Sequence, residues 1–312
     1  MPRSSDRKPG FPAPENGTTS RLRLVGPAGE PRRPAVEVPA PPRVIALASA
    51  KGGVGRSHLA LNLAVALAGQ GRPTILADAD FGLRQQTLLS GIDPTHDLGH
   101  VLKGLRGPGE VAIEGPGGVR ILPGPVSLST ADLADPELPE RVLDVIAEFA
   151  GPGDVVLLDL PSGVHPASLR LAAGAGEVLL VITPDVTSWT EARNLQRRLA
   201  EFEPGPLGVL VNRVGSIQEA ADAFTRMVTA SGEIPAYWGY VPEDPIVAEA
   251  GRRGRPFVLL APNAPASRQV GKLARRILEE PVPKSRRSSS TLSLRRPDAA
   301  AVPVQESRLN PS

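Results

Sequence analysis

The sequence predicts an α/β fold in which a mostly parallel β-sheet is covered by helices on both faces. Three observations favour this fold. Short apolar runs of strand-forming residues alternate with segments of helical periodicity from residue 43 to residue 280. A glycine-rich segment joins the first run to the first helical segment. The 41% hydrophobic content of the 312 residues suffices for one large domain of this kind with two tails.

Taken in order along the chain, the strands are expected at 44–48, 73–77, 119–122, 154–159, 177–183, 207–212 and 237–241. The helices are expected at 56–70, 84–90, 97–103, 138–150, 166–173, 188–201, 216–230, 245–252 and 266–279. Ligands of such sheets bind at the carboxyl ends of the strands. The residues that follow each strand are therefore the candidates for a site.

The two ends of the chain differ from its middle. Residues 1–42 contain ten prolines and have a net charge of +3, and residues 281–312 have a net charge of +4, whereas residues 43–280 have a net charge of −5. Such basic tails cannot bury enough apolar surface to fold, so we expect them to be disordered. They are either linkers without a partner or arms that contact anionic surfaces.

Several classes of protein are excluded by composition. The chain has no cysteine, which excludes disulfides, iron–sulfur clusters and thiolate zinc sites. The four histidines share no metal-ligand spacing. No secretory signal is visible in the first twenty residues, so a cytoplasmic location is expected, and no apolar run has the length of a membrane span.

The residues after the first strand form a phosphate-binding loop, Ser-Ala-Lys-Gly-Gly-Val-Gly-Arg-Ser at 49–57. Its glycines allow successive backbone N–H groups to face a polyphosphate, and the next helix adds its positive end. We therefore predict that the loop binds ATP and that the Ser57 hydroxyl holds Mg²⁺. The predicted nucleotide-binding residues of the loop are Gly52, Gly53, Val54, Gly55, Arg56, Ser57 and His58. A glycine turn without a ligand is the alternative.

Carboxylates follow two further strands. Asp78 and Asp80 stand one residue apart, so both side chains project the same way from an extended chain. Such an acid near the γ-phosphate orients the attacking water. Asp159 follows four apolar residues, which is typical of an acid that binds Mg²⁺ through water. The predicted metal ligands are thus Ser57, Asp78 and Asp159, and an acid that merely closes a strand is the alternative.

Asn212 ends the strand at 207–212, and its amide is suited to an adenine edge. The alternative is an asparagine that closes a turn before Gly215.

These residues together resemble the MinD/ParA family of deviant Walker ATPases, whose loop has the sequence Lys-Gly-Gly-x-Gly-Lys-Thr/Ser. The resemblance implies a P-loop NTPase fold of the SIMIBI class, ATP and Mg²⁺ as cofactors, and a homodimer that forms when ATP binds. It implies catalytic roles for Lys51, which reaches the phosphates of the other subunit, and for Asp80, which activates water. It also identifies Asp159 as the Walker B acid.

Within this family the chain is similar to the FlhG/FleN branch, which governs flagellar number and placement. The segments that carry this likeness are Gly82-Leu83, Leu88–Gly91, Val211–Arg213, Gly239–Pro245, Arg255–Phe257 and Pro265–Arg268. They add Pro242 to the predicted nucleotide-binding residues. The likeness covers 43–280, so we expect one ATPase domain there, flanked by the tails at 1–42 and 281–312.

Three departures from the family pattern modify this reading. Arg56 replaces the loop lysine, and its wide planar fork substitutes poorly for a compact ammonium, so slow hydrolysis is expected. The amino-terminal tail lacks the Asp-Gln-Ala-x-x-Leu-Arg element that stimulates a partner GTPase in flagellar systems. The tail at 285–296 is basic but not amphipathic, unlike the membrane-targeting helix of MinD, and is at most an electrostatic anchor.

Three functions stay open. The first is an ATP-dependent dimerising switch that positions a flagellum, a polar complex or a DNA locus with an unknown partner protein. The second is a pseudo-ATPase that serves as a binding module. The third is a ParA-like carrier on nucleoid DNA, with a basic face of Arg252, Arg253, Arg255, Lys272, Arg275 and Arg276. For all three, the expected location is the cytoplasm, including the periphery of the inner membrane or the nucleoid.

Overall fold

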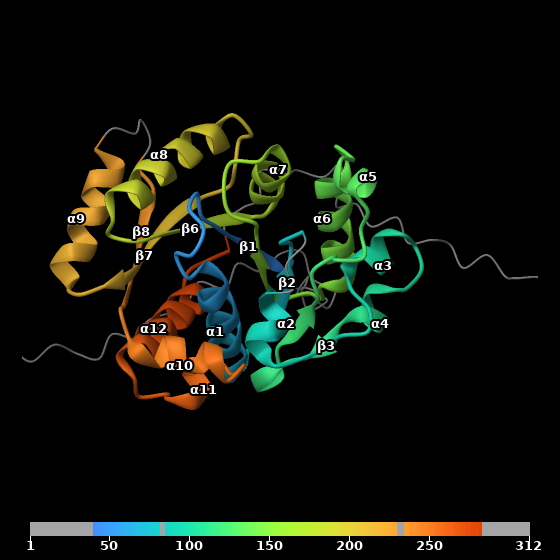
Figure 1. Cartoon of the computed structure of the whole chain (residues 1–312), viewed down its shortest axis with the longest axis horizontal. Helices are drawn as coiled ribbons and strands as arrows, with labels where there is room; N and C mark the ends of the chain where they lie inside the picture. Colours follow the sequence, from blue (N-terminus) through green and yellow to red (C-terminus); the bar gives the residue numbers. More distant parts are fainter. Residues whose placement is uncertain (1–39, 82–84, 230–233, 283–312) are drawn as a thin grey trace, which may run out of the picture. The chain divides into compact units, whose positions relative to one another are not determined.

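In a computed structural model of the protein, residues 40–81, 85–229 and 234–282 are described. Two sets of predictions lie outside these residues. They concern the tails, apart from residues 40–42 and 281–282, and the Gly82-Leu83 segment. An eight-stranded sheet with the order β3-β4-β2-β5-β1-β6-β7-β8 runs through the described chain (Figure 1).

The strands are β1 (Arg43–Ala48), β2 (Thr74–Asp78), β3 (Ile113–Glu114), β4 (Arg120–Leu122), β5 (Val155–Asp159), β6 (Glu177–Ile182), β7 (Leu207–Val214) and β8 (Ala236–Pro242). The helices are α1 (Arg56–Gly69), α2 (Gln85–Ser90), α3 (Leu98–Leu102), α4 (Pro108–Val111), α5 (Thr130–Leu133), α6 (Leu138–Phe149), α7 (Pro166–Gly174), α8 (Val186–Ala200), α9 (Ile217–Val228), α10 (Pro245–Arg252), α11 (Phe257–Leu260) and α12 (Pro265–Glu279). A 3₁₀ turn, η1, covers Pro116–Gly118.

The sheet is parallel except at one edge. β1 lies between β5 and β6, and β2 lies between β5 and β4, with every one of these pairs parallel. Among the described strands only β3 runs antiparallel, against β4. The carboxyl ends of the seven parallel strands therefore meet at one edge of the sheet, which is where ligands bind in sheets of this kind.

Helices cover both faces of the sheet (Figure 1). Side chains alternate along a strand, and β1 shows the consequence. Ile45 and Leu47 belong to the core beneath α1 and α12, whereas Ala46 and Ala48 belong to the core beneath α6 to α9. All four are buried. The sheet is thus the middle of three layers, which confirms the predicted α/β architecture.

The seven predicted strands and nine predicted helices are present with ends within two residues of those expected, as far as the described residues extend. Five short elements among the described residues were not predicted: β3, α4, α5, α11 and the 3₁₀ turn η1. Each has two to four residues, too few for a repeat of 2 or 3.6 residues to be visible in a sequence. Among the described residues, no helix combines the length and the apolar character needed to cross a membrane.

Candidate functional site

The candidate residues of three strands gather at the carboxyl edge of the sheet. The phosphate-binding loop follows β1, which lies next to β5, and β5 in turn lies next to β2. Asp78 and Asp159 occupy paired positions at the ends of β2 and β5, and both are completely buried. The topology thus brings a glycine-rich loop and two carboxylates together at the edge expected for a ligand.

The loop depends on glycine at two positions. Gly53 and Gly55 have φ of 76° and 87°, in the left-handed region where other residues are strained. Gly55 is also the N-cap of α1, and no side chain caps that helix. The N-terminus of the 14-residue α1 is thus available to an anion that the loop surrounds.

The Arg56 side chain turns towards the acids of the site. Its Nε donates to Asp159 Oδ1 at 2.6 Å, and its Nη1 donates to Ser49 Oγ at 3.2 Å. Its Nη2 lies 3.4 Å from Asp80 Oδ2. Only 6% of the Arg56 side chain is exposed. The residue at the position of the family's loop lysine is therefore an internal ion-pair partner of two of the three acids.

Gln86, on α2, is a residue of this site that sequence reasoning missed. Its Nε2 donates to Asp159 Oδ2 at 2.6 Å and to the Ser57 carbonyl oxygen at 3.1 Å. Its backbone N–H donates to Asp78 Oδ2. The Gln86 side chain is completely buried, and its Oε1 has no hydrogen-bond partner among the described residues. The adjacent Gln85 has the same side chain, so the sequence offered no signal that separates the two.

Burial and crowding change the acidity of the site. Burial, and then the nearby charge of Asp159, raises the pKa of Asp78 well above its usual range. Burial also raises the pKa of Asp80, although the Arg56 guanidinium opposes that effect. A carbon atom added at Gly124, in the loop after β4, would lie 3.0 Å from the Asp78 carboxyl carbon. Asp78 is therefore enclosed from several sides.

Lys51 points away from this acidic cluster. Its Nζ donates to Asp185 Oδ1 at 2.8 Å and to Thr187 Oγ1 at 3.0 Å, and 40% of its side chain is exposed. Although burial opposes it, hydrogen bonds from Lys51, Thr183 and Thr187 hold the pKa of Asp185 well below its usual range. The ammonium thus lies at the rim of the site, on the loop between β6 and α8.

A hollow of about 330 Å³ opens beside the loop. It is lined by Lys51, Gly52, Gly53, Val54, Thr183, Pro184, Asp185, Arg213, Glu219 and Glu243. Asn212 does not line the hollow, and its Nδ2 donates to the carbonyl oxygen of Val54, which does, at 2.7 Å. The hollow is large enough for part of a nucleotide and lies where the loop residues meet the ends of β6 and β7.

Two further predicted residues lie at the margin of this region. His58 packs against α10, since a carbon atom added at Gly251 would lie 2.9 Å from its ring. Burial, followed by the charge of Arg213, lowers the pKa of His58. Pro242 is the last residue of β8, paired with Val214, and Glu243, one of the lining residues, follows it.

The acidic cluster contains the three predicted metal ligands. Ser57, Asp78 and Asp159 do lie close together, and oxygen ligands suit Mg²⁺. Both oxygens of Asp159, however, accept from nitrogen donors, and the Arg56 guanidinium lies among the carboxylates. As they are arranged, these residues fit a second, divalent cation poorly.

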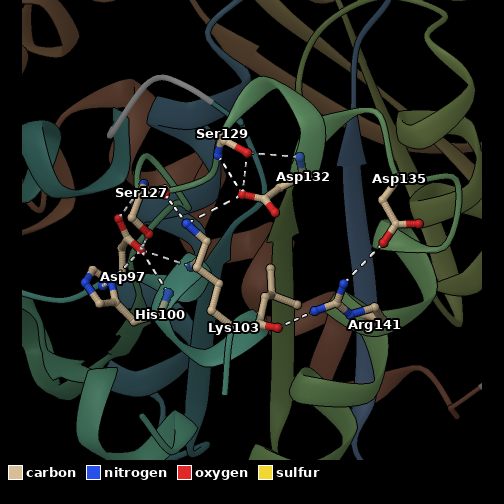
Figure 2. A network of polar contacts seen from close by, with 10 residues as sticks. Asp97, His100, Lys103, Ser127, Ser129, Asp132, Asp135 and Arg141 are labelled. Carbon is tan, nitrogen blue, oxygen red and sulfur yellow. Dashed lines mark hydrogen bonds and ion pairs between the residues drawn. The ribbon is translucent and has the colours of Figure 1, made fainter. Parts of the chain in front are cut away.

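A separate network of polar contacts holds the loop that contains Gly124 (Figure 2). Lys103 Nζ donates to the Ser127 carbonyl oxygen at 2.7 Å and pairs with Asp132 at 3.5 Å. Asp132 accepts from the Ser129 hydroxyl and backbone N–H at the start of α5. The contacts join α3, the loop after β4 and α5, so the loop beside Asp78 is supported from outside the site.

Comparisons with known proteins identify the family and the fold. The model of the CobQ/CobB/MinD/ParA nucleotide-binding domain matches residues 45–257. The chain belongs to this family. An uncharacterized ATP-binding protein of Methanocaldococcus jannaschii is 31% identical over 235 residues, which are 75% of this chain and 87% of that protein. The antiactivator FleN of Pseudomonas aeruginosa is 30% identical over 248 residues, 78% of this chain and 89% of FleN.

Solved structures of MinD/ParA proteins have the same fold. The septum site-determining protein MinD of Pyrococcus horikoshii, complexed with Mg-ADP, is 27% identical and aligns with a TM-score of 0.65 over 76% of this chain and 96% of that one. Other matched proteins are named septum site-determining protein MinD and chromosome-partitioning ATPase Soj. The family resemblance inferred from the loop and the three acids is thus confirmed, and the family includes ATPases.

Proposed function

We propose that this member of the MinD/ParA family is a switch that binds ATP, dimerises on it and regulates the positioning or number of a cellular structure. Relatives named septum site-determining protein, antiactivator and chromosome-partitioning ATPase support a role of this kind. A MinD of Aquifex aeolicus forms a complex with MinC, which supports a partner protein here too. The structure acted upon is a flagellum, a polar complex or a DNA locus, reached from the cytoplasm.

The main support for the proposed dimer is the position of Lys51. Its ammonium lies at the exposed rim of the hollow, paired with Asp185, rather than among the acids at the ends of β2 and β5. An exposed ion pair of this kind is weak, so Lys51 is able to exchange Asp185 for another anion. A phosphate bound in the same place by a second subunit is the anion that the family resemblance implies.

A second candidate, a pseudo-ATPase that binds nucleotide without useful turnover, is supported by Arg56. Asp80, the acid proposed to activate water, lies 3.4 Å from the Arg56 guanidinium, and Asp159 accepts from the same group. Burial raises the pKa of Asp80 overall, but the guanidinium opposes that effect and already occupies one of the two Asp80 oxygens that could accept from water. We therefore propose that hydrolysis is slow.

The DNA-carrier alternative has less support. Three of the six basic residues of the proposed face have acidic partners: Arg252 and Arg253 pair with Glu249, and Arg276 pairs with Glu280. Arg276 Nη1 also donates to the Tyr237 carbonyl oxygen at 2.7 Å. Charges neutralised in this way contribute less to a surface that attracts phosphates.

Light scattering of the full chain tests the dimer, and phosphate release tests turnover. With a non-hydrolysable ATP analogue, we expect a dimer for the wild type and a monomer for Lys51→Ala. Lys272→Ala is the control and should dimerise as the wild type does, because Lys272 is an exposed lysine of α12 that does not line the hollow. A monomer for all three chains would contradict the switch. Turnover is expected to rise in Arg56→Lys; a wild type that is equally fast would contradict slow hydrolysis.

A further inference from the structure

The Arg56 guanidinium occupies the centre of the acidic cluster with all three of its nitrogens. Nε, Nη1 and Nη2 meet Asp159, Ser49 and Asp80 at 2.6, 3.2 and 3.4 Å. The arginine is the first residue of α1, and its side chain is 6% exposed. The positively charged guanidinium therefore lies beside Asp159, the acid that the family resemblance assigns to the metal ion.

Gln86 binds the second carboxylate oxygen of Asp159. Its amide nitrogen donates to Asp159 Oδ2 at 2.6 Å, opposite the oxygen that Arg56 holds. The orientation of this amide is fixed, because its two neighbours, the Asp159 carboxylate and the Ser57 carbonyl, are both acceptors. Turning Oε1 towards them would place oxygen against oxygen. Both oxygens of the Walker B acid are thus engaged by nitrogen donors.

A lysine at this position would behave differently. It carries one compact ammonium on a flexible stem, which can move to the phosphates without disturbing the acids. The arginine is anchored at Nε, next to its aliphatic stem, and cannot leave without breaking the hydrogen bond to the completely buried Asp159. A divalent ion placed among these acids would also meet the repulsion of the guanidinium.

We propose that this chain binds its nucleotide without a divalent cation, because the Arg56 guanidinium and the Gln86 amide already engage the acids that would hold one. The inference rests on the proposed binding of ATP. A guanidinium has five N–H bonds, and three are used on Asp159, Ser49 and Asp80. The guanidinium does not line the hollow beside the loop, so the phosphates are left to the backbone N–H groups of the loop and the N-terminus of α1.

The test is the affinity of the full chain for a fluorescent ATP analogue in Mg²⁺ and in excess EDTA. For the wild type we expect equal affinity in both solutions, within about threefold. For Arg56→Lys we expect binding that is roughly tenfold or more weaker in EDTA. Arg120→Lys is the control, since Arg120 also pairs with a buried aspartate, Asp154, but lies on β4. It should behave as the wild type.

A second measurement uses Mn²⁺ alone as the metal probe. Electron paramagnetic resonance with ADP present should detect no bound Mn²⁺ on the wild type and one equivalent on Arg56→Lys. A wild type that loses roughly tenfold in affinity in EDTA, or that binds one Mn²⁺, overturns the inference and leaves ATP binding intact. Absence of binding in both solutions overturns the ATP proposal and this inference together. The wild-type comparison needs no variant to fold.

Discussion

Ser127 donates to Asp97 twice, from its hydroxyl to Oδ1 at 2.6 Å and from its backbone N–H to Oδ2 at 3.0 Å (Figure 2). Asp97 is completely buried, and it also caps α3 by accepting from the backbone of Gly99 and His100. One carboxylate thus ties the start of α3 to the loop after β4, and this loop begins beside Asp78.

Asp97→Asn should destabilise the protein by about 1–3 kcal/mol. Both carboxylate oxygens of Asp97 accept hydrogen bonds, whereas an asparagine amide has only one acceptor oxygen. Urea unfolding at neutral pH measures the change. Asp222→Asn is the control, since Asp222 is exposed and accepts from Gln218 Nε2 on the same helix. Equal stability of the two variants would contradict a structural role for Asp97.

The difference in stability between the wild type and Asp97→Asn should depend on pH. Although burial opposes it, hydrogen bonds from Ser127 and His100 lower the pKa of Asp97 in the folded state. A lowered folded pKa adds stability above the unfolded pKa of about 3.9 and loses it as the pH falls through the folded value. The difference between wild type and Asp97→Asn should therefore shrink below about pH 4. A difference that grows on acidification would contradict this sign.

Gly124→Ala should disturb the acidic site without removing any of its polar groups. The added carbon would lie 3.0–3.3 Å from the Asp78 carboxyl atoms, closer than ordinary contact. We expect a loss of about 1–3 kcal/mol and weaker binding of an ATP analogue, because the carboxylate must move. Gly109→Ala, where no atom lies within 4 Å, is the control for both measurements. If the two variants bind the analogue equally, Asp78 tolerates the shift.

The sequence was sufficient for the sheet and for the edge at which the site lies. In β6 the residues from Val178 to Ile182 form an uninterrupted apolar run, and α9 and α12 have clear helical spacing. These signals arise because each element buries a whole face, so the spacing of its apolar residues follows from which side chains are packed in the core. β3 pairs through two residues only, and backbone pairing of that length leaves no such pattern.

The site was predictable in its residue types but not in its contacts. Arg56 was recognised as a departure, yet no sequence rule decides whether a guanidinium faces a phosphate or the acids behind it. Gln86 was missed because its role follows from the direction of one short helix. Asn212 was predicted to contact adenine; its amide instead holds the Val54 carbonyl here, so the contact with adenine stays a prediction.

The buried ion pair at the opposite end of β1 gives a stability prediction. Arg43 Nε and Nη2 donate to the two Glu177 carboxylate oxygens at 2.6 and 2.8 Å, and both side chains are about 5% exposed. Glu177→Gln should cost about 3–5 kcal/mol, since it leaves the guanidinium buried beside a neutral amide. The control is Glu201→Gln, in the exposed pair with Arg198, for which no measurable loss is expected in thermal unfolding.

Asp185→Asn should favour the proposed ATP dimer. Asn keeps the N-cap of α8, where Asp185 accepts from Ser188, but it removes the charge that holds Lys51. Freeing the ammonium should tighten dimerisation up to about fivefold, because an exposed ion pair is worth at most ~1 kcal/mol. Light scattering over a concentration series with a non-hydrolysable ATP analogue measures this, with Asp135→Asn as the control for losing an exposed acid. Weaker dimerisation in Asp185→Asn would mean that Asp185 orients Lys51 for the partner instead of restraining it.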